Sequence, residues 1–203
     1  MNLLRTDIIN LYINKFNYKK YLEIGVQYGQ NIKHIKCDLK HGVDVAKQTE
    51  HVTHHMSSDD FFKQNTETYD IIFIDGHHDS EYVCRDLNNS IKCLNKHGII
   101  IMHDCKPHSL TYSLKLKEWE RVPNDGGWCG DGFKVIKSLV KNYKDNFDVF
   151  VIDTDNGVGI VKPLTSDIEI SYDDNYAWES MIQNPEKEIN LISVEEFKNN
   201  INN

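Results

Sequence analysis

The sequence predicts a single α/β domain built on a mostly parallel sheet with helices on both of its faces. Short apolar segments alternate with segments of helical periodicity over roughly the first half of the chain. Residues 70–75 and 97–104 carry runs of successive apolar positions, as strands covered on both faces do. Residues 147–153 and 157–162 are joined by only three residues, a link too short for a parallel crossover. This last pair predicts one antiparallel strand.

Strands are expected at seven apolar or alternating segments, several of which end in glycine or aspartate. They cover residues 20–25, 41–45, 52–56, 70–75, 97–104, 147–153 and 157–162. The third is the weakest of them and the fourth is the most apolar. A chain of 203 residues is long enough to bury a substantial core around such a sheet.

Helices are expected where apolar residues recur every three or four positions. Leu4, Ile8 and Leu11 have this spacing in the first helix. The expected helices cover residues 3–16, a turn or two at 30–36, and residues 57–64, 79–94 and 131–143. Ser58 or Asp59 is expected to cap the helix at 57–64, because short polar side chains can accept a hydrogen bond from the first turn.

The alternation stops after Asp104. Residues 105–130 hold two of the four prolines and a glycine-rich stretch, and predict a loop-rich insertion with a short helix around 112–119. Near the end of the chain, Ser193 and Glu196 have the spacing of a capping box. The sequence contains no internal repeat or linker, so residues 1–203 are interpreted as one domain.

The composition argues against nucleic acid as a partner. The net charge of −8 and the pI of about 5.6 indicate a surface that repels phosphate backbones, and basic residues form no cluster. Five cysteines, an odd number without CxxC spacing, predict reduced thiols in the cytoplasm. The first residues lack the apolar core of a signal peptide, and no run approaches membrane-spanning length. We therefore expect a cytoplasmic protein without membrane contact.

The stretch YLEIGVQYGQ places two glycines between a strand and a helical turn. Gly25 and Gly29 would let the backbone approach a ligand closely, and Asp44 ends the next strand, where a carboxylate can accept the hydroxyls of a ribose. The dinucleotide fingerprint GxGxxG is absent. The alternative interpretation is a tight turn that binds nothing.

This stretch resembles motif I of the class I S-adenosylmethionine-dependent methyltransferases, in which an acidic residue, here Glu23, lies two positions before the first glycine. Gln27 stands where that family has its middle glycine. The resemblance extends over most of the chain, in the order of a group associated with sugar and glycan modification. The stretches are SSDDFF, YDIIFIDGHHDSEYVCRDLNNSIKCLNKHGIIIMHDCKP, WCGDGFKVI, VIDTDNGVGIV and NLISVEEF. It implies a Rossmann-like sheet of seven strands, one of them antiparallel.

The resemblance also implies S-adenosylmethionine as the cofactor. Glu23 would lie near its methionine portion and Asp44 would bind its ribose. Ser58 with Asp59 would lie beside its adenine. The expected cofactor site consists of Glu23, Gly25, Gln27, Gly29, Asp44, Ser58, Asp59 and Asp75.

Two carboxylates end neighbouring strands of the expected sheet. Asp75 and Asp104 would lie about 5 Å apart if these strands are adjacent, a spacing that suits one Mg²⁺ ion. Metal-dependent methyltransferases of the catechol and sugar types resemble this arrangement, although Cys105 stands where a further oxygen ligand would follow. The alternatives are a helix cap for Asp75 and a loop cap for Asp104.

All ten histidines lie between His34 and His108. Transfer of a methyl group to oxygen requires a base for the hydroxyl proton, and imidazole titrates near neutral pH. His78 is the first candidate and His103 the second, with Asp104 beside it. A histidine hydrogen-bonded at a strand end is the alternative for His103, and His77 is interpreted as a loop residue.

The insertion is expected to act as a lid over a small-molecule acceptor, a sugar or a nucleotide-sugar. Trp128 would stack on a sugar ring, and Asp125 or Asp131 would bind hydroxyls; the alternative for Trp128 is a core position. We therefore predict an O-methyltransferase. The rivals are a metal-dependent hydrolase that uses the same strand ends and a non-catalytic cofactor-binding module. The sequence leaves the oligomeric state open, a homodimer included.

Overall fold

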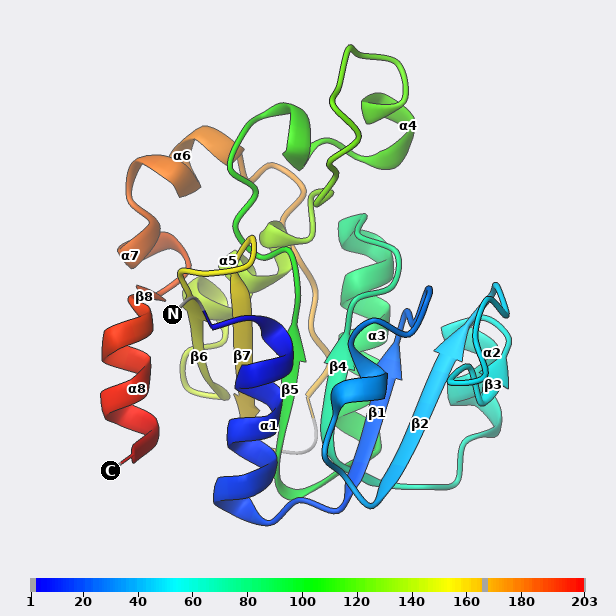
Figure 1. Ribbon diagram of the computed structural model, residues 1–203. Coiled ribbons are helices and arrows are strands. Elements are labelled where there is room, and N and C mark those ends of the chain that lie inside the picture. The colour runs from blue at the N-terminus through cyan, green and yellow to red at the C-terminus, as the bar shows by residue number, and fades with distance from the viewer. Residues whose placement is uncertain (1–2, 166–167, 203) are drawn as a thin grey trace.

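The computed structural model describes residues 3–165 and 168–202, and these form an eight-stranded sheet in the order β3-β2-β1-β4-β5-β7-β6-β8 (Figure 1). The strands are β1 Lys20–Ile24, β2 Leu39–Asp44, β3 His54–His55, β4 Tyr69–Ile74, β5 Leu94–Met102, β6 Phe147–Ile152, β7 Val158–Pro163 and β8 Leu191–Ile192. β7 pairs antiparallel with β5 and β6, whereas the other pairs are parallel. One reversed strand in a parallel sheet confirms the predicted arrangement.

Helices cover both faces of this sheet, as predicted. The helices are α1 Arg5–Phe16, α2 Ser58–Gln64, α3 Ser80–Lys92, α4 Leu116–Trp119, α5 Phe133–Asn142, α6 Trp178–Gln183, α7 Pro185–Glu188 and α8 Val194–Asn202. Short 3₁₀ turns lie at Ile32–His34 and Thr111–Ser113. Apolar residues of α2, α3 and α5 pack on one face of the sheet, and those of α1 and α8 pack on the other. The alternating side chains of the central strands thereby enter two separate cores.

The sheet has one strand more than the seven expected. β8 comprises only Leu191 and Ile192, which pair with Val151 and Ile152 of β6. Two half-buried residues give no apolar run and no alternation that a sequence pattern could reveal.

The cap of α2 also differs from the prediction. Ser57, rather than Ser58 or Asp59, is the N-cap, and its hydroxyl accepts a hydrogen bond from the backbone N–H of Asp60 at 3.1 Å. The helix therefore begins at Ser58, earlier than a cap at Ser58 or Asp59 would allow, and both of these residues belong to its first turn.

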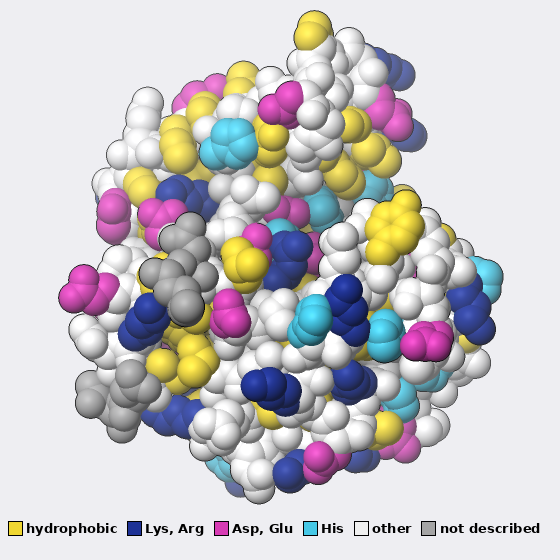
Figure 2. Space-filling model, viewed as in Figure 1, with side chains coloured by type: hydrophobic (Ala, Val, Ile, Leu, Met, Phe, Trp, Pro, Cys, Tyr) yellow, Lys and Arg dark blue, Asp and Glu magenta, His cyan; other side chains and the backbone are white. Residues whose placement is uncertain are grey.

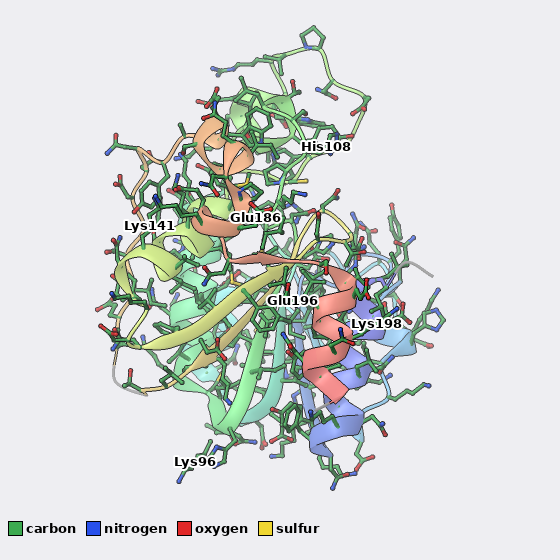
Figure 3. All side chains as sticks on the ribbon, turned by 90° about the vertical axis from the view of Figure 1, so that its left-hand side faces the viewer. Lys96, His108, Lys141, Glu186, Glu196 and Lys198 are labelled. Atoms are coloured by element: carbon green, nitrogen blue, oxygen red, sulfur yellow. The ribbon has the colours of Figure 1, made fainter. Side chains whose placement is uncertain are left out.

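The insertion lies above the carboxyl ends of the parallel strands. In Figure 3 its residue His108 lies at that end of the molecule, whereas Lys96, in β5, lies at the opposite end. Within residues 105–130 the regular structure is limited to Thr111–Ser113 and α4, which agrees with the loop-rich character predicted. In the described part of the chain, no helix combines the length and the hydropathy that crossing a bilayer would need.

Candidate active site

The carboxyl ends of β1, β4 and β5 form one edge. The N–H of Asp75 donates to the carbonyl of Ile24 at 2.8 Å, and the N–H of His103 donates to that of Ile74 at 3.1 Å. Gly25 is essential to this approach, because a Cβ at its position would lie 2.1 Å from the carbonyl oxygen of Asp75. Its φ of +87° is also one that only glycine adopts without strain.

Asp44 organises the loop that follows β1. Its Oδ2 accepts hydrogen bonds from the backbone N–H groups of Val26 and Gln27 at 2.9 and 2.8 Å, and its Oδ1 accepts one from Ala46 at 2.8 Å. Gln27 adopts a left-handed φ of +49° here. Asp44 therefore lies beside the glycine loop, as the sequence predicts, and it also fixes that loop's conformation.

Glu23 lies beneath the same loop and is 1% exposed. Its Oε2 accepts hydrogen bonds from the Tyr21 hydroxyl and from Asn31 Nδ2, the latter at 2.8 Å. Burial raises the pKa of Glu23 to about 8, although these two donors oppose the shift.

Ser58 and Asp59 lie in the first turn of α2, which follows β3. The N–H of Met56, the residue after β3, donates to the carbonyl of Asp44 at 3.0 Å.

Two histidines and two carboxylates meet where β4 and β5 end. His78 Nε2 lies 3.5 Å from Asp75 Oδ1, and His78 Nδ1 lies 3.2 Å from Asp104 Oδ2. His103 Nδ1 lies 3.2 Å from Asp75 Oδ1 and 3.3 Å from Asp104 Oδ2. We call these four residues the His/Asp cluster. Asp104 is 5% exposed and has a left-handed φ of +54°, a strained conformation of the kind that gathers at functional sites.

The charges within the cluster stabilise one another. Burial disfavours the charged form of Asp75, but His103 and His78 outweigh it and hold the pKa of Asp75 well below its usual range. Burial likewise opposes protonation of His78 and His103, but the surrounding carboxylates raise the pKa of both, that of His103 strongly. Asp75 does not cap a helix: the N-cap position of α3 is Asp79.

The cluster has the donor atoms for a divalent cation. One ligand atom each from Asp75, His78 and Asp104 lie within 4.8 Å of one another. Two buried atoms among them, Asp104 Oδ1 and His78 Nδ1, have no hydrogen-bond partner in the described structure. A cavity of about 10 Å³ beside Asp75, His78 and His103 has room for roughly one water molecule or ion. The Sγ of Cys105 lies 3.5 Å from the backbone carbonyl oxygens of Met102 and His103.

Sequence patterns missed two residues of this site. Asp155, in the turn between β6 and β7, lies 3.5 Å from His103 Nε2. Arg5, the first residue of α1, contacts both ring nitrogens of His103 and lies 3.4 Å from Asp155 Oδ1. No local spacing could have linked residues 150 positions apart in the chain.

The insertion covers the cluster. The ring of Trp128 stacks on His78 with 4.8 Å between centroids and an angle of 17°, and its Nε1 donates to the carbonyl of Leu114 at 2.8 Å. Trp128 is half-buried. Figure 2 shows the surface hollowed between the insertion and the loops beyond β1 and β2, with acidic, basic and histidine side chains gathered there.

The two aspartates expected to bind hydroxyls have different surroundings. Asp131 is 2% exposed, accepts a hydrogen bond from the N–H of Ser80 at 2.6 Å and pairs with Lys134 at 3.0 Å. It therefore fixes the start of α3. Asp125 is exposed and accepts a hydrogen bond from the Tyr112 hydroxyl at 2.9 Å, so a ligand could reach it.

Residues 26–105 match the model of a family described as a methyltransferase domain. The matched range runs from the glycine loop to the end of β5 and so includes Asp44 and the whole His/Asp cluster. It spans less than half of the chain. No curated protein shows significant sequence similarity to this chain.

Solved methyltransferase structures share the fold over most of both chains. A candidate caffeoyl-CoA O-methyltransferase from Staphylococcus aureus is 18% identical, with 80% of this chain and 84% of that chain covered and a TM-score of 0.57. An O-methyltransferase from Bacillus cereus in complex with SAH is 14% identical, with coverages of 78% and 80% and a TM-score of 0.53. The SAH-bound Podospora anserina methyltransferase PaMTH1 is 16% identical, with coverages of 79% and 78% and a TM-score of 0.53. The fold is therefore the Rossmann-like fold of class I methyltransferases.

Proposed function

We propose that this protein is an S-adenosylmethionine-dependent methyltransferase that acts on a hydroxyl oxygen of a small polar acceptor. The observation that carries the proposal is the common edge at which the glycine loop, Asp44 and the His/Asp cluster meet. The family match over residues 26–105 and the SAH bound to two proteins of this fold support it.

The reaction requires little covalent chemistry from the side chains of the protein. The acceptor oxygen attacks the methyl carbon, the bond between that carbon and sulfur breaks, and S-adenosylhomocysteine leaves while the hydroxyl proton passes to a base. The protein must therefore align two reactants and accept one proton. His78 is the more accessible imidazole, because its side chain is 20% exposed and that of His103 only 6%.

A divalent cation such as Mg²⁺ fits the residues of the cluster, and when bound it would orient the hydroxyl and lower the hydroxyl pKa. Asp75 and Asp104 would supply its oxygen ligands, with His78 as the third. His78 thus has two candidate roles, proton acceptor or ligand, and they predict different results. In His78→Gln, loss of a base lowers kcat and leaves the affinity for Mn²⁺ unchanged, whereas loss of a ligand weakens Mn²⁺ binding.

The acceptor class we propose is a sugar or nucleotide-sugar. The support is the resemblance to sugar-modifying methyltransferases together with the aromatic and carboxylate groups of the insertion, Trp128 and Asp125, which suit a sugar ring and its hydroxyls. Release of S-adenosylhomocysteine from a panel of sugar nucleotides and catechols tests this choice. Turnover of catechols alone would contradict it.

Calorimetry tests the cofactor. We expect S-adenosylhomocysteine to bind and NAD not to, and Asp44→Ala to weaken binding more than about tenfold, or about 1.4 kcal/mol. Asp38→Ala, which alters a surface ion pair with Lys19, is the control. Binding of NAD alone would overturn the proposal.

The rival functions predict other outcomes. A metal-dependent hydrolase would bind Mn²⁺ at the cluster and be indifferent to Asp44→Ala. A non-catalytic module would bind S-adenosylhomocysteine and would show no turnover that His78→Gln could lower.

A further inference from the structure

Two segments far apart in the chain meet behind the His/Asp cluster. The N–H of Arg5 donates to Asp155 Oδ2 at 3.0 Å, and its guanidinium Nη1 lies 3.4 Å from Asp155 Oδ1. The Thr154 hydroxyl donates to the carbonyl of Leu3 at 2.6 Å. The first turn of α1 is thereby bound to the β6–β7 turn.

The β6–β7 turn is in turn fixed to the segment that carries Asp104. The N–H of Cys105 donates to the carbonyl of Gly157 at 3.0 Å, and the N–H of Lys106 donates to that of Asn156 at 2.8 Å. The contact is so close that a Cβ on Gly157 would lie 2.6 Å from the nitrogen of Lys106. Asp155 therefore cannot shift without moving the exit of β5.

His103 lies between this pair and the carboxylates of the cluster. Its Nδ1 faces Asp75 and Asp104, while its Nε2 lies 3.5 Å from Asp155. Arg5 Nη1 contacts both ring nitrogens, with 3.1 Å to Nδ1. Its ring also contacts Phe73, with 6.3 Å between centroids. Arg5 and Asp155 neutralise each other, so the pair adds almost no net charge behind the cluster.

We propose that Arg5 and Asp155 are positioning residues that hold the His103 ring against Asp75 and Asp104 and so keep these carboxylates oriented for a divalent cation. This inference rests on the cation site of the proposed function. It assigns to α1 a part in the site, although α1 lies wholly outside the range that matches the methyltransferase family.

The test is the affinity for Mn²⁺ alone, measured by calorimetry and by electron paramagnetic resonance without cofactor or acceptor. Partners behind metal ligands typically affect affinity about 10- to 100-fold. We expect about a tenfold loss in Arg5→Met and in Asp155→Asn, and recovery of most of that loss in Arg5→Lys. Asp153→Asn is the matched control, because it breaks the neighbouring ion pair with Lys106 and should alter the affinity less than about twofold.

A second measurement reports on His103 without any metal. The ¹⁵N-coupled imidazole signals of His103, assigned with His103→Gln, should shift in Arg5→Met and Asp155→Asn and stay in place in Asp153→Asn. A role limited to attaching α1 would lower the melting temperature and leave both these signals and the Mn²⁺ affinity as in the wild type. That result would overturn the inference.

The outcomes separate this inference from the proposed function. If Arg5→Met and Asp155→Asn bind Mn²⁺ as tightly as the wild type does, the inference is contradicted and the cation site stands. If the wild type binds S-adenosylhomocysteine but no Mn²⁺, both the cation site and the inference are contradicted. Failure to bind S-adenosylhomocysteine removes the methyltransferase proposal, while the Mn²⁺ comparison still decides the inference. If Arg5→Met does not fold, Asp155→Asn and Arg5→Lys provide the comparison.

Discussion

The charge state of Glu23 depends on its buried environment. The side chain is buried and hydrogen-bonded to Tyr21 and Asn31, and burial raises its pKa to about 8. An unfolded chain would have a glutamate pKa of about 4.3. Between these values the folded state keeps a proton that the unfolded state releases, so stability is fully present below about pH 4 and is lost as the pH rises towards 8.

Replacement of Glu23 by Gln should remove this pH dependence, because the amide stays neutral. As the pH rises from 5 to 8, we expect the free energy of unfolding of Glu23→Gln to increase relative to that of the wild type by about 2 kcal/mol or more. This corresponds to about 4 °C or more in Tm. Thermal melts of both proteins across this interval measure the difference. Parallel curves at all pH values would show that Glu23 is ionised throughout.

The choice of residue at position 25 is limited by steric space rather than by charge. A methyl group there would collide with the carbonyl of Asp75, which is backbone and cannot move alone. Gly25→Ala should therefore cost about 3 kcal/mol or more and abolish binding of S-adenosylhomocysteine. Gly126→Ala is a useful comparison, since its φ of +92° is strained for alanine while no atom lies within 4 Å of the added Cβ. Equal losses in both variants would mean that backbone strain, rather than the collision, sets the cost.

At the scale of the elements, the start of α2 depends on its N-cap. Ser57→Ala should destabilise the protein by about 1 kcal/mol, because it removes the acceptor for the N–H of Asp60. Ser57→Asn, which keeps a side-chain acceptor at the cap, should cost less than about 0.5 kcal/mol. Urea unfolding of the two variants makes the comparison. Equal losses in both variants would contradict the observed cap.

The central elements were predictable because their patterns are local. Asp44 ends β2, and Asp75 and Asp104 follow β4 and β5 within two residues, so all three could be placed at the carboxyl edge of the parallel strands from the sequence. β8 was not predictable, because its two residues pair with β6 only after α6 and α7 have brought them back. Arg5 and Asp155 were not predictable either, since their meeting depends on how α1 and the β6–β7 hairpin lie on the finished sheet.

At the scale of the whole molecule, the insertion and the sheet form two parts joined at the His/Asp cluster. Trp128 stacks on His78, and Asp79 Oδ1 accepts a hydrogen bond from the N–H of Leu116 at 2.8 Å. Within the insertion, the Tyr112 hydroxyl donates a hydrogen bond to Asp125. Trp128 covers part of His78, whose side chain is 20% exposed.

Trp128→Ala should loosen this junction and leave the sheet intact. We expect faster amide hydrogen exchange across residues 112–130 and an unchanged affinity for S-adenosylhomocysteine, because the glycine loop and Asp44 are untouched. Mass spectrometry of exchanged peptides measures it, with Val122→Ala, an exposed lid position, as the control. Exchange that is as slow as in the wild type would show that the other contacts suffice to hold the lid.

The contact between Arg5 and Asp155 also has a bearing on how the protein is made. During synthesis α1 emerges from the ribosome about 150 residues before the β6–β7 turn, and folding must close this long loop before either partner gains from the contact. Until then His103 and its carboxylates lack their outer support. The contact that completes the surroundings of His103 is thus among the last that the nascent chain can form, after most of the sheet can already have formed.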